Sequence, residues 1–418
     1  MPPLRIHALA ALRITVRVMA GTWLAFVATE PVAAQATAEP LTLAAAMDRA
    51  LAANPTIAAA RLGRAINLAG LAVAGERPNP EATIEVEKET PKQSFGFAVP
   101  LELGGKRARR IAVSRATLDI GDAELAATIV QVRNDVRRGY FDTLVADARL
   151  GVLRELRDVA QRARTTAQTR FELGDAPRLE VLQADLALNT AEAEAISAAG
   201  AVEAARSKLN ALLGLPLDAV RPLTTTLEPG DAIVAADVVE RARGSSTELL
   251  VLDRRIDEQR AKLALARALR VPDAVPGVTL THDAEPEFTY GWRASVAIAL
   301  PIFTSHKAAA TVEDAALRQL AAQREATRLR IVGDVTAAAM AAEAQRKAYV
   351  QYRDKILPQA RQVEELAQDS YRLGQTGLTA LLQVLQASRD VRLRSLDVLS
   401  QFQTGLADLE RTIGAALP

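Results

Sequence analysis

The sequence contains no cysteine, which excludes disulfide bonds, thiolate metal sites, a cysteine nucleophile and a lipid-modified N-terminal cysteine. Its three histidines, His7, His282 and His306, are isolated from one another, a pattern more typical of surface or packing positions than of a metal site. No HExxH motif, glycine-rich phosphate loop or GxSxG motif is present. We therefore predict no catalytic residues, no cofactor and no metal site, and a chain that is not an enzyme.

The first 34 residues have the features of a secretory signal peptide. Arg5, Arg13 and Arg17 form a positive region, 18–28 is a short apolar stretch, and Val32-Ala33-Ala34 has the small residues of a cleavage site. The alternative, a membrane anchor, needs about 20 apolar residues. The formal net charge is only +1, so charge does not favour a nucleic-acid partner. We predict an exported protein that binds no nucleic acid.

One pattern occurs twice in the chain, about 200 residues apart. Phe171–Gly174 corresponds to Tyr371–Gly374, Gly214 to Gly414 and, shifted by one residue, Pro100 to Pro301. Each copy predicts a helix, a β-hairpin, a very long helix, a tight turn and a returning helix. The predicted organisation is a signal peptide at 1–34, a first structural repeat at 35–230 and a second structural repeat at 231–418.

The predicted helices are unusually long. Residues 43–76 have helical periodicity, and no proline interrupts 106–171, which as one helix would rise roughly 100 Å at about 1.5 Å per residue. Such a helix needs neighbours along its side, which favours a coiled coil. In the second copy, apolar positions from Ile331 to Ile356 alternate steps of 4 and 3, but Pro358 predicts a kink or break. Glycines at 174 and 374 predict helix-to-helix turns.

Two segments alternate with a period of two and predict β-hairpins, giving four strands of about 8 to 11 residues. One face is apolar and the other small or polar, as in the wall of a membrane barrel. Four strands cannot enclose a channel, whereas three chains would supply twelve. The alternative is a small soluble sheet packed on a core. Predicted lipid-facing residues are Phe95, Phe97, Val99, Tyr290, Trp292, Val296 and Ile298, and Arg293 is predicted to face the lumen.

On these residues the chain resembles the TolC family of outer-membrane efflux channels over essentially the whole mature sequence. The motifs that carry the resemblance are, in order, Leu41–Leu43 with Asn54-Pro55, Pro78-Asn79-Pro80, Pro100–Arg107, Pro301-Ile302-Phe303 and the turns at Gly174 and Gly374. Residues 101–107 and the turn at 170–177 look most like the cation-efflux, CzcC-like branch.

The resemblance implies a mainly α-helical fold with a membrane β-barrel. It implies a homotrimer in which four strands per chain build a twelve-stranded barrel among outer-membrane lipids, continued by an α-helical tunnel in the periplasm. The implied partners are a periplasmic adaptor (membrane fusion protein) and an inner-membrane RND pump, which supplies the energy. The chain itself would be a passive duct for substrates, with heavy-metal cations as the substrate class of that branch.

The resemblance also places the tunnel tip and adaptor-docking region at the two turns. In relatives an acidic pair after the second turn narrows the entrance; here the matching residues are Ala380 and Gln383, while the first copy keeps Glu180. The residues predicted to form this region are Phe171, Gly174, Glu180, Tyr371, Gly374, Thr376, Leu378, Ala380 and Gln383.

Two alternatives stay open from the sequence. The first keeps the channel but changes its cargo, as in a drug-efflux or type I secretion duct. The second is a soluble periplasmic coiled-coil adaptor or structural protein. Lys106, Arg107, Arg109 and Arg110 begin the first long helix and suit either a solvated face or contact with lipid headgroups at the barrel junction.

Overall fold

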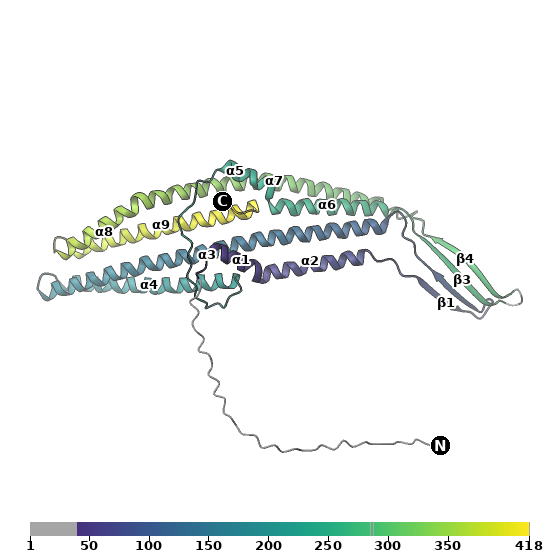
Figure 1. Cartoon of the computed structure of the whole chain (residues 1–418), viewed down its shortest axis with the longest axis horizontal. Helices are drawn as coiled ribbons and strands as arrows, with labels where there is room; N and C mark the ends of the chain where they lie inside the picture. Colours follow the sequence, from purple (N-terminus) through teal and green to yellow (C-terminus); the bar gives the residue numbers. More distant parts are fainter. Residues whose placement is uncertain (1–39, 285, 287, 418) are drawn as a thin grey trace, which may run out of the picture. The chain divides into compact units, whose positions relative to one another are not determined.

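The computed structural model describes residues 40–284, 286 and 288–417, so the predicted signal peptide and His7 lie outside the described residues. The described residues from Pro40 onward form one compact unit of long helices and one sheet (Figure 1). The elements are α1 Leu43–Ala53, α2 Pro55–Ala74, β1 Glu81–Val86, β2 Gln93–Ala98, α3 Lys106–Glu172, α4 Arg178–Leu212, α5 Ala235–Ser245, α6 Thr247–Ala268, β3 Ala274–Ala284, β4 Phe288–Ile298, α7 Lys307–Gln351, a π-helical turn Tyr352–Ile356, α8 Leu357–Arg372 and α9 Leu378–Ile413.

The predicted helix over 43–76 is wrong in one respect, because the chain forms two helices there. Asn54 is extended and caps α2, its side-chain oxygen accepting from Thr56 N at 2.9 Å. Pro55 follows at the first helical position, where its missing N–H costs nothing. The Asn54 amide also donates to Leu212 O at 3.0 Å, so the break is held against the end of α4. By length and composition α2 is the one helix among the described residues that could cross a membrane, and here it packs along α3.

The helix α3 organises the fold, with 67 residues and therefore a length of about 100 Å. It contacts α1, α2, α4, α6 and α9 along its sides (Figure 1). It contributes to three of the four clusters of buried apolar residues in the described chain, through Val132 and Val136, through Leu150 and Leu153, and through Val159 and Ala163. The core is therefore a series of small clusters spaced along a helix, as the coiled-coil interpretation requires.

The sequence predicted either a kink or a break of the second long helix at Pro358, and the helix does not break there. The chain stays helical from Lys307 to Arg372, but Tyr352–Ile356 adopts a π-helical turn. A proline lacks an N–H and its ring collides with the carbonyl four residues earlier, which here belongs to Asp354 inside that turn. A π turn accommodates an extra residue and moves this carbonyl away. Pro358 therefore disturbs the helix by widening it locally over the preceding turn, without ending it.

The four strands form one antiparallel sheet in the order β1-β2-β3-β4. The strands β3 and β4 have 11 residues each, but β1 and β2 have 6, so the predicted length of 8 to 11 is wrong for the first hairpin. Pro80 and Pro91 border this hairpin and cannot donate to a ladder. The pairing register aligns Ile84, Phe95, Leu280 and Trp292 on one face, and the row beside it, Thr83, Gly96, Thr279 and Arg293, on the other. The predicted alternation of the two faces is present.

Tyr140 joins three distant parts of the chain in the middle of α3. Its side chain is fully buried, and its hydroxyl donates to Leu41 O at 2.7 Å. The same oxygen accepts from Thr225 N at 3.2 Å and lies 3.0 Å from Thr225 Oγ1. Through this one hydroxyl, the residues before α1 and the connector after α4 are fixed to the long helix.

Replacement of Tyr140 by phenylalanine should therefore destabilise the fold. The change removes the shorter of the two hydrogen bonds to Leu41 O, which still accepts from Thr224 N at 3.3 Å, and it leaves Thr225 N without its acceptor, at a cost of about 1–3 kcal/mol. Thermal unfolding of the purified protein measures this loss. Tyr349→Phe is the matched control, because its hydroxyl makes no hydrogen bond to another described residue, and an equal loss in both variants would contradict the assigned role of Tyr140.

Candidate functional site at the helix-to-helix turns

The two turns between long helices have the same backbone geometry. After α3, Gly174 adopts a φ of +83°, Asp175 N donates to Arg170 O at 2.8 Å and Gly174 N donates to Phe171 O at 3.0 Å. After α8, Gly374 adopts a φ of +72° with the equivalent bonds to Ser370 O at 2.9 Å and Tyr371 O at 3.0 Å. This pair of bonds ending on a left-handed residue is a Schellman motif. A β-carbon at either glycine would meet no atom of the described chain within 4 Å, so φ alone requires glycine.

A polar cluster connects the two turns. The Tyr371 hydroxyl on α8 donates to Glu180 Oε1 on α4 at 2.7 Å. Arg170 at the end of α3 donates to the same oxygen at 3.3 Å and lies over the Tyr371 ring, 5.3 Å from its centroid. The Tyr371 side chain is buried, and burial together with the Glu180 carboxylate raises its pKa. The hydroxyl therefore stays protonated and keeps donating to the carboxylate across the neutral pH range.

The other residues predicted for this region divide into two groups. Leu378 is buried in a cluster with Ala163, Ala167 and Leu381, so it supports the turn from inside. The predicted residues that the structure leaves exposed are Phe171, Gly174, Gly374, Thr376, Ala380 and Gln383. The positions of the missing acidic pair, Ala380 and Gln383, thus present no charge on this surface.

An apolar groove near the turns was missed by the sequence reasoning. It lies between α4 and α9, has a volume of about 330 Å³ and is lined by Leu186, Leu382 and Leu385 among other residues. Leu179 and Leu182 extend the exposed leucines toward the turn. Leu179, Leu182 and Leu186 are separated by steps of 3 and 4, a spacing that places them on one face of α4 and that could have been recognised in the sequence. This apolar face is exposed in the described chain.

A row of ion pairs holds α9 against the first helical hairpin. Arg389 of α9 pairs with Glu194 of α4 at 2.6 Å, and Glu410 pairs with Arg137 of α3 at 2.7 Å, both partners of the latter being largely shielded from solvent. Arg392 and Asp397 pair with Glu155 and Arg149 of α3 between these two levels. The pairs cross between the two halves of the chain, which sequence periodicity cannot reveal.

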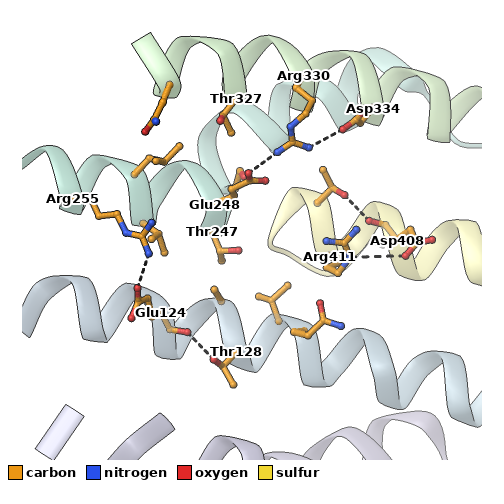
Figure 2. Close-up of a pocket in the computed structure, with 18 of the residues that line it drawn as sticks. Glu124, Thr128, Thr247, Glu248, Arg255, Thr327, Arg330, Asp334, Asp408 and Arg411 are labelled. Carbon is orange, nitrogen blue, oxygen red and sulfur yellow. Dashed lines mark hydrogen bonds and ion pairs between the residues drawn. The ribbon is translucent and has the colours of Figure 1, made fainter. Parts of the chain in front are cut away.

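A larger cavity lies where α9 ends and α6 begins, against α3 and α7, with a volume of about 970 Å³ (Figure 2). Its walls are charged, but its arginines are already paired. Arg255 binds Glu124 at 3.0 Å, and Arg330 binds Glu248 at 2.5 Å and Asp334 at 2.9 Å (Figure 2). With its arginines paired in this way, the cavity offers no free cationic group to a ligand.

The described residues contain no group of three or more His, Asp or Glu side chains arranged to hold a metal ion. His282 lies on β3 beside Tyr290, with 4.6 Å between the ring centroids. His306 caps α7 in a left-handed conformation at a φ of +52°. The histidines that were considered as metal contacts therefore occupy two unrelated positions.

Comparisons with known proteins agree with this fold. The family model described as "Outer membrane efflux protein" matches residues 46–215. The cobalt-zinc-cadmium resistance protein CzcC of Cupriavidus metallidurans is 26% identical over 390 residues, which cover 92% of each chain. Among solved structures, CusC aligns with a TM-score of 0.75 at 14% identity over 91% of this chain and 94% of CusC. The open state of MtrE from Neisseria gonorrhoeae aligns with a TM-score of 0.70 at 20% identity over 90% and 89%.

The fold is thus that of a TolC-like outer-membrane channel, a class of transport proteins that are not enzymes. The chain is similar in sequence and fold to CzcC-like outer-membrane efflux proteins, and its location is the outer membrane, with a tunnel that extends into the periplasm. This assignment excludes the alternative of a soluble periplasmic adaptor.

The contact between Tyr371 and Glu180 should hold the two helical hairpins together at their turns. Tyr371→Phe removes a hydrogen bond to a charged group, which contributes about 1.5–3 kcal/mol. We expect a higher conductance of the variant in planar bilayers, because the two helical hairpins lose their connection at the turns. Tyr352→Phe, on the same helical rod but outside the cluster, is the control. Unchanged conductance of Tyr371→Phe would show that the contact does not restrict the entrance.

Proposed function

We propose that three copies of this chain form the outer-membrane duct of a tripartite efflux system that exports heavy-metal cations. The proposed metal substrate rests on the similarity to CzcC, a cobalt-zinc-cadmium resistance protein, across 92% of both chains. In this proposal a periplasmic adaptor and an inner-membrane RND pump complete the system and supply the energy, and the chain acts as a passive conduit. Residues 1–34 are the signal peptide, and 35–230 and 231–418 are duplicated halves that place two hairpins and two helical pairs in each subunit.

The trimer is supported by the edges of the sheet. The strands β1 and β4 each pair on one side only, which leaves two rows of unpaired backbone groups in one chain. Natural proteins cover or close such edges. Four strands are too few for a water-filled barrel, since membrane barrels have eight or more. Pairing β4 of each copy with β1 of the next closes a barrel of twelve strands and removes every edge.

The orientation of the barrel wall follows from the two faces of the sheet. Phe95, Phe97, Trp292, Val296 and Ile298 are all exposed in the single chain, although they are large and apolar. In the proposed barrel they contact lipid together with Val99, and Tyr290 lies among them near a strand end, where aromatic residues favour the membrane interface. Arg293, on the face with Gly96 and Thr279, then lines the water-filled lumen.

A pair of neighbouring substitutions tests this orientation. A charge on the lipid face costs about 2–4 kcal/mol at the bilayer midplane and less toward either interface. Val296 lies two residues before the end of β4, so Val296→Arg should reduce the amount of trimer assembled in the outer membrane by part of this cost, while Ala297→Arg, on the opposite face, should assemble nearly normally. The measurement is heat-modifiable trimer in isolated outer membranes, and equal yields for the two variants would reject the assigned faces.

The periplasmic turns and the leucine groove between α4 and α9 form the proposed docking surface for the adaptor. The groove opens close to the turns, and its exposed leucines suit the apolar face of a partner helix. Phe171 and Thr376 are exposed residues of the turns, whereas Tyr371 and Leu378 are buried and keep the turns in place. Docking in this mode depends on the shape of the turns.

Gly374→Val should separate assembly from transport. The left-handed φ of Gly374 strongly disfavours a β-branched residue, so the turn is displaced. Because the lesion lies about 100 Å from the sheet, trimer yield should stay near normal while metal tolerance is lost in cells that carry the partner pump. Gly200→Val is the control, since Gly200 lies within α4 with nothing within 4 Å. Loss of the trimer would instead make the turn a folding element, and full tolerance would remove it from the docking surface.

Cells that carry the partner adaptor and pump, with and without this chain, test the cargo. We expect the chain to restore tolerance to cobalt, zinc or cadmium ions and to lower their cellular content. Restoration of drug tolerance without any change in metal tolerance would favour the drug-efflux alternative. The Val296→Arg variant is the negative control, because it reduces the amount of assembled duct and leaves the other components unchanged.

A further inference from the structure

A specific joint closes the region between the sheet and the helices within one chain. Leu101 N, after β2, donates to Ala274 O at 2.8 Å, and Leu103 N donates to Asp273 Oδ1 at 2.9 Å. Lys106, the first residue of α3, binds Asp273 Oδ2 at 2.8 Å, and its side chain is only 9% exposed. The connector between β2 and α3 is thereby fixed to the connector between α6 and β3.

The connector between β4 and α7 has the same form but has no partner in the described chain. Pro301 corresponds to Pro100 and Lys307, the first residue of α7, to Lys106. The capping residues Gly105 and His306 both adopt the left-handed conformation, with φ of +71° and +52°. In this second connector Ile302 and Phe303 are exposed, Phe303 completely, and within the described chain no carboxylate pairs with Lys307.

The counterpart of the Asp273 connector is the stretch between α2 and β1. Pro78 and Asn79 follow the last residue of α2 by four and five positions, as Pro272 and Asp273 follow the last residue of α6. Residues 76–80 are all exposed.

Arg107 and Arg110 of α3 bind the backbone oxygens of Gly75 and Glu76 at 2.7 Å each, whereas Arg77–Pro80 make no hydrogen bond to another described residue. This exposed stretch and the connector after β4 adjoin opposite edges of the sheet, since one precedes β1 and the other follows β4. Within one chain they cannot form the joint that their counterparts form.

We infer that these connectors meet between neighbouring copies of the chain. The connector Leu300–Lys307 of one copy docks on Arg77–Pro80 of the next, with the Lys307 ammonium donating to the Asn79 side-chain oxygen in the place of the ion pair between Lys106 and Asp273. Pairing β4 with β1 of the next copy brings the two stretches to the same side of the barrel. This joint rests on the proposed trimer, and it names the residues that connect the subunits at the periplasmic rim of the sheet.

In this inference, the exposed connector Leu300–Lys307 is covered by a second copy of the chain and not by lipid alone. An asparagine in place of an aspartate gives a weaker contact, because only the lysine is then charged and the Coulomb attraction between two opposite charges is absent. The joint between subunits is accordingly weaker than the joint within each subunit. A single substitution, Asn79→Asp, should convert it to the stronger form.

Cross-linking tests the proximity directly, since the chain has no cysteine of its own. Asn79→Cys combined with Lys307→Cys, treated with a short bismaleimide in the assembled trimer, should give covalent dimers and trimers after denaturation. The yield should exceed that of either single variant by about tenfold, as expected for thiols held close together. Leu101→Cys with Ala274→Cys is the matched reference, because this bridged pair should link within one chain and leave its mass unchanged.

The strength of the joint is tested by trimer dissociation in heated detergent. Asn79→Asp should raise the dissociation temperature, and adding Lys307→Ala should abolish that gain, since the two residues then no longer interact. Arg318→Ala is the control on the same helix, where Arg318 pairs with Asp314 one turn away. A trimer that forms but gives no 79–307 cross-link, or a gain that persists without Lys307, overturns the joint and leaves the trimer standing. If no trimer forms, both the proposed assembly and the joint are rejected.

Discussion

A helix of 67 residues cannot be stabilised by one globular core, because any neighbour covers only part of its length. The structure meets this constraint with several neighbours in succession, α2 and α6 on the side of the sheet and α4 and α9 on the side of the turns. From Val132 onward, successive stretches of α3 contribute buried side chains, mostly alanine, valine and leucine, to separate small clusters. Small side chains let several helices approach the same rod, and the ion pairs across α9 fix their alignment.

The two halves of the chain share an order of elements but differ at the turns between their long helices. Tyr371 of the second half corresponds to Phe171 of the first, which has no hydroxyl to donate, and Glu180 corresponds to the uncharged Ala380. Only one bond of this kind therefore forms between the hairpins of a chain. The π turn adds a second difference, because α3 is regular where the other rod is widened ahead of Pro358.

Much of this fold is predictable from the sequence, since long-range periodicity and glycine position are local signals. The unbroken apolar spacing from Lys106 predicts α3, and the left-handed requirement at Gly174 and Gly374 predicts both turns. The break between α1 and α2 at Asn54 was not predicted from the sequence, because the apolar pattern continues on both sides of it. The hydrogen bond between Tyr371 and Glu180 could not be predicted for another reason. The two residues are 191 positions apart, and a contact over that separation depends on how the helices are arranged in space.

The arginine-carboxylate pairs have a consequence for the residence time of cargo. Divalent cations are retained by carboxylate oxygens that converge and are free of other partners. Along these helices many of the carboxylates already accept from an arginine, as Asp253 does from Arg324 and Glu343 from Arg346, whose guanidinium holds the pKa of Glu343 down to about 2. A carboxylate engaged in this way competes poorly for a passing ion. In the proposed duct, carboxylates engaged in this way would not chelate metal ions, so the ions would leave as fast as they arrive, which is what a conduit requires and a storage protein avoids.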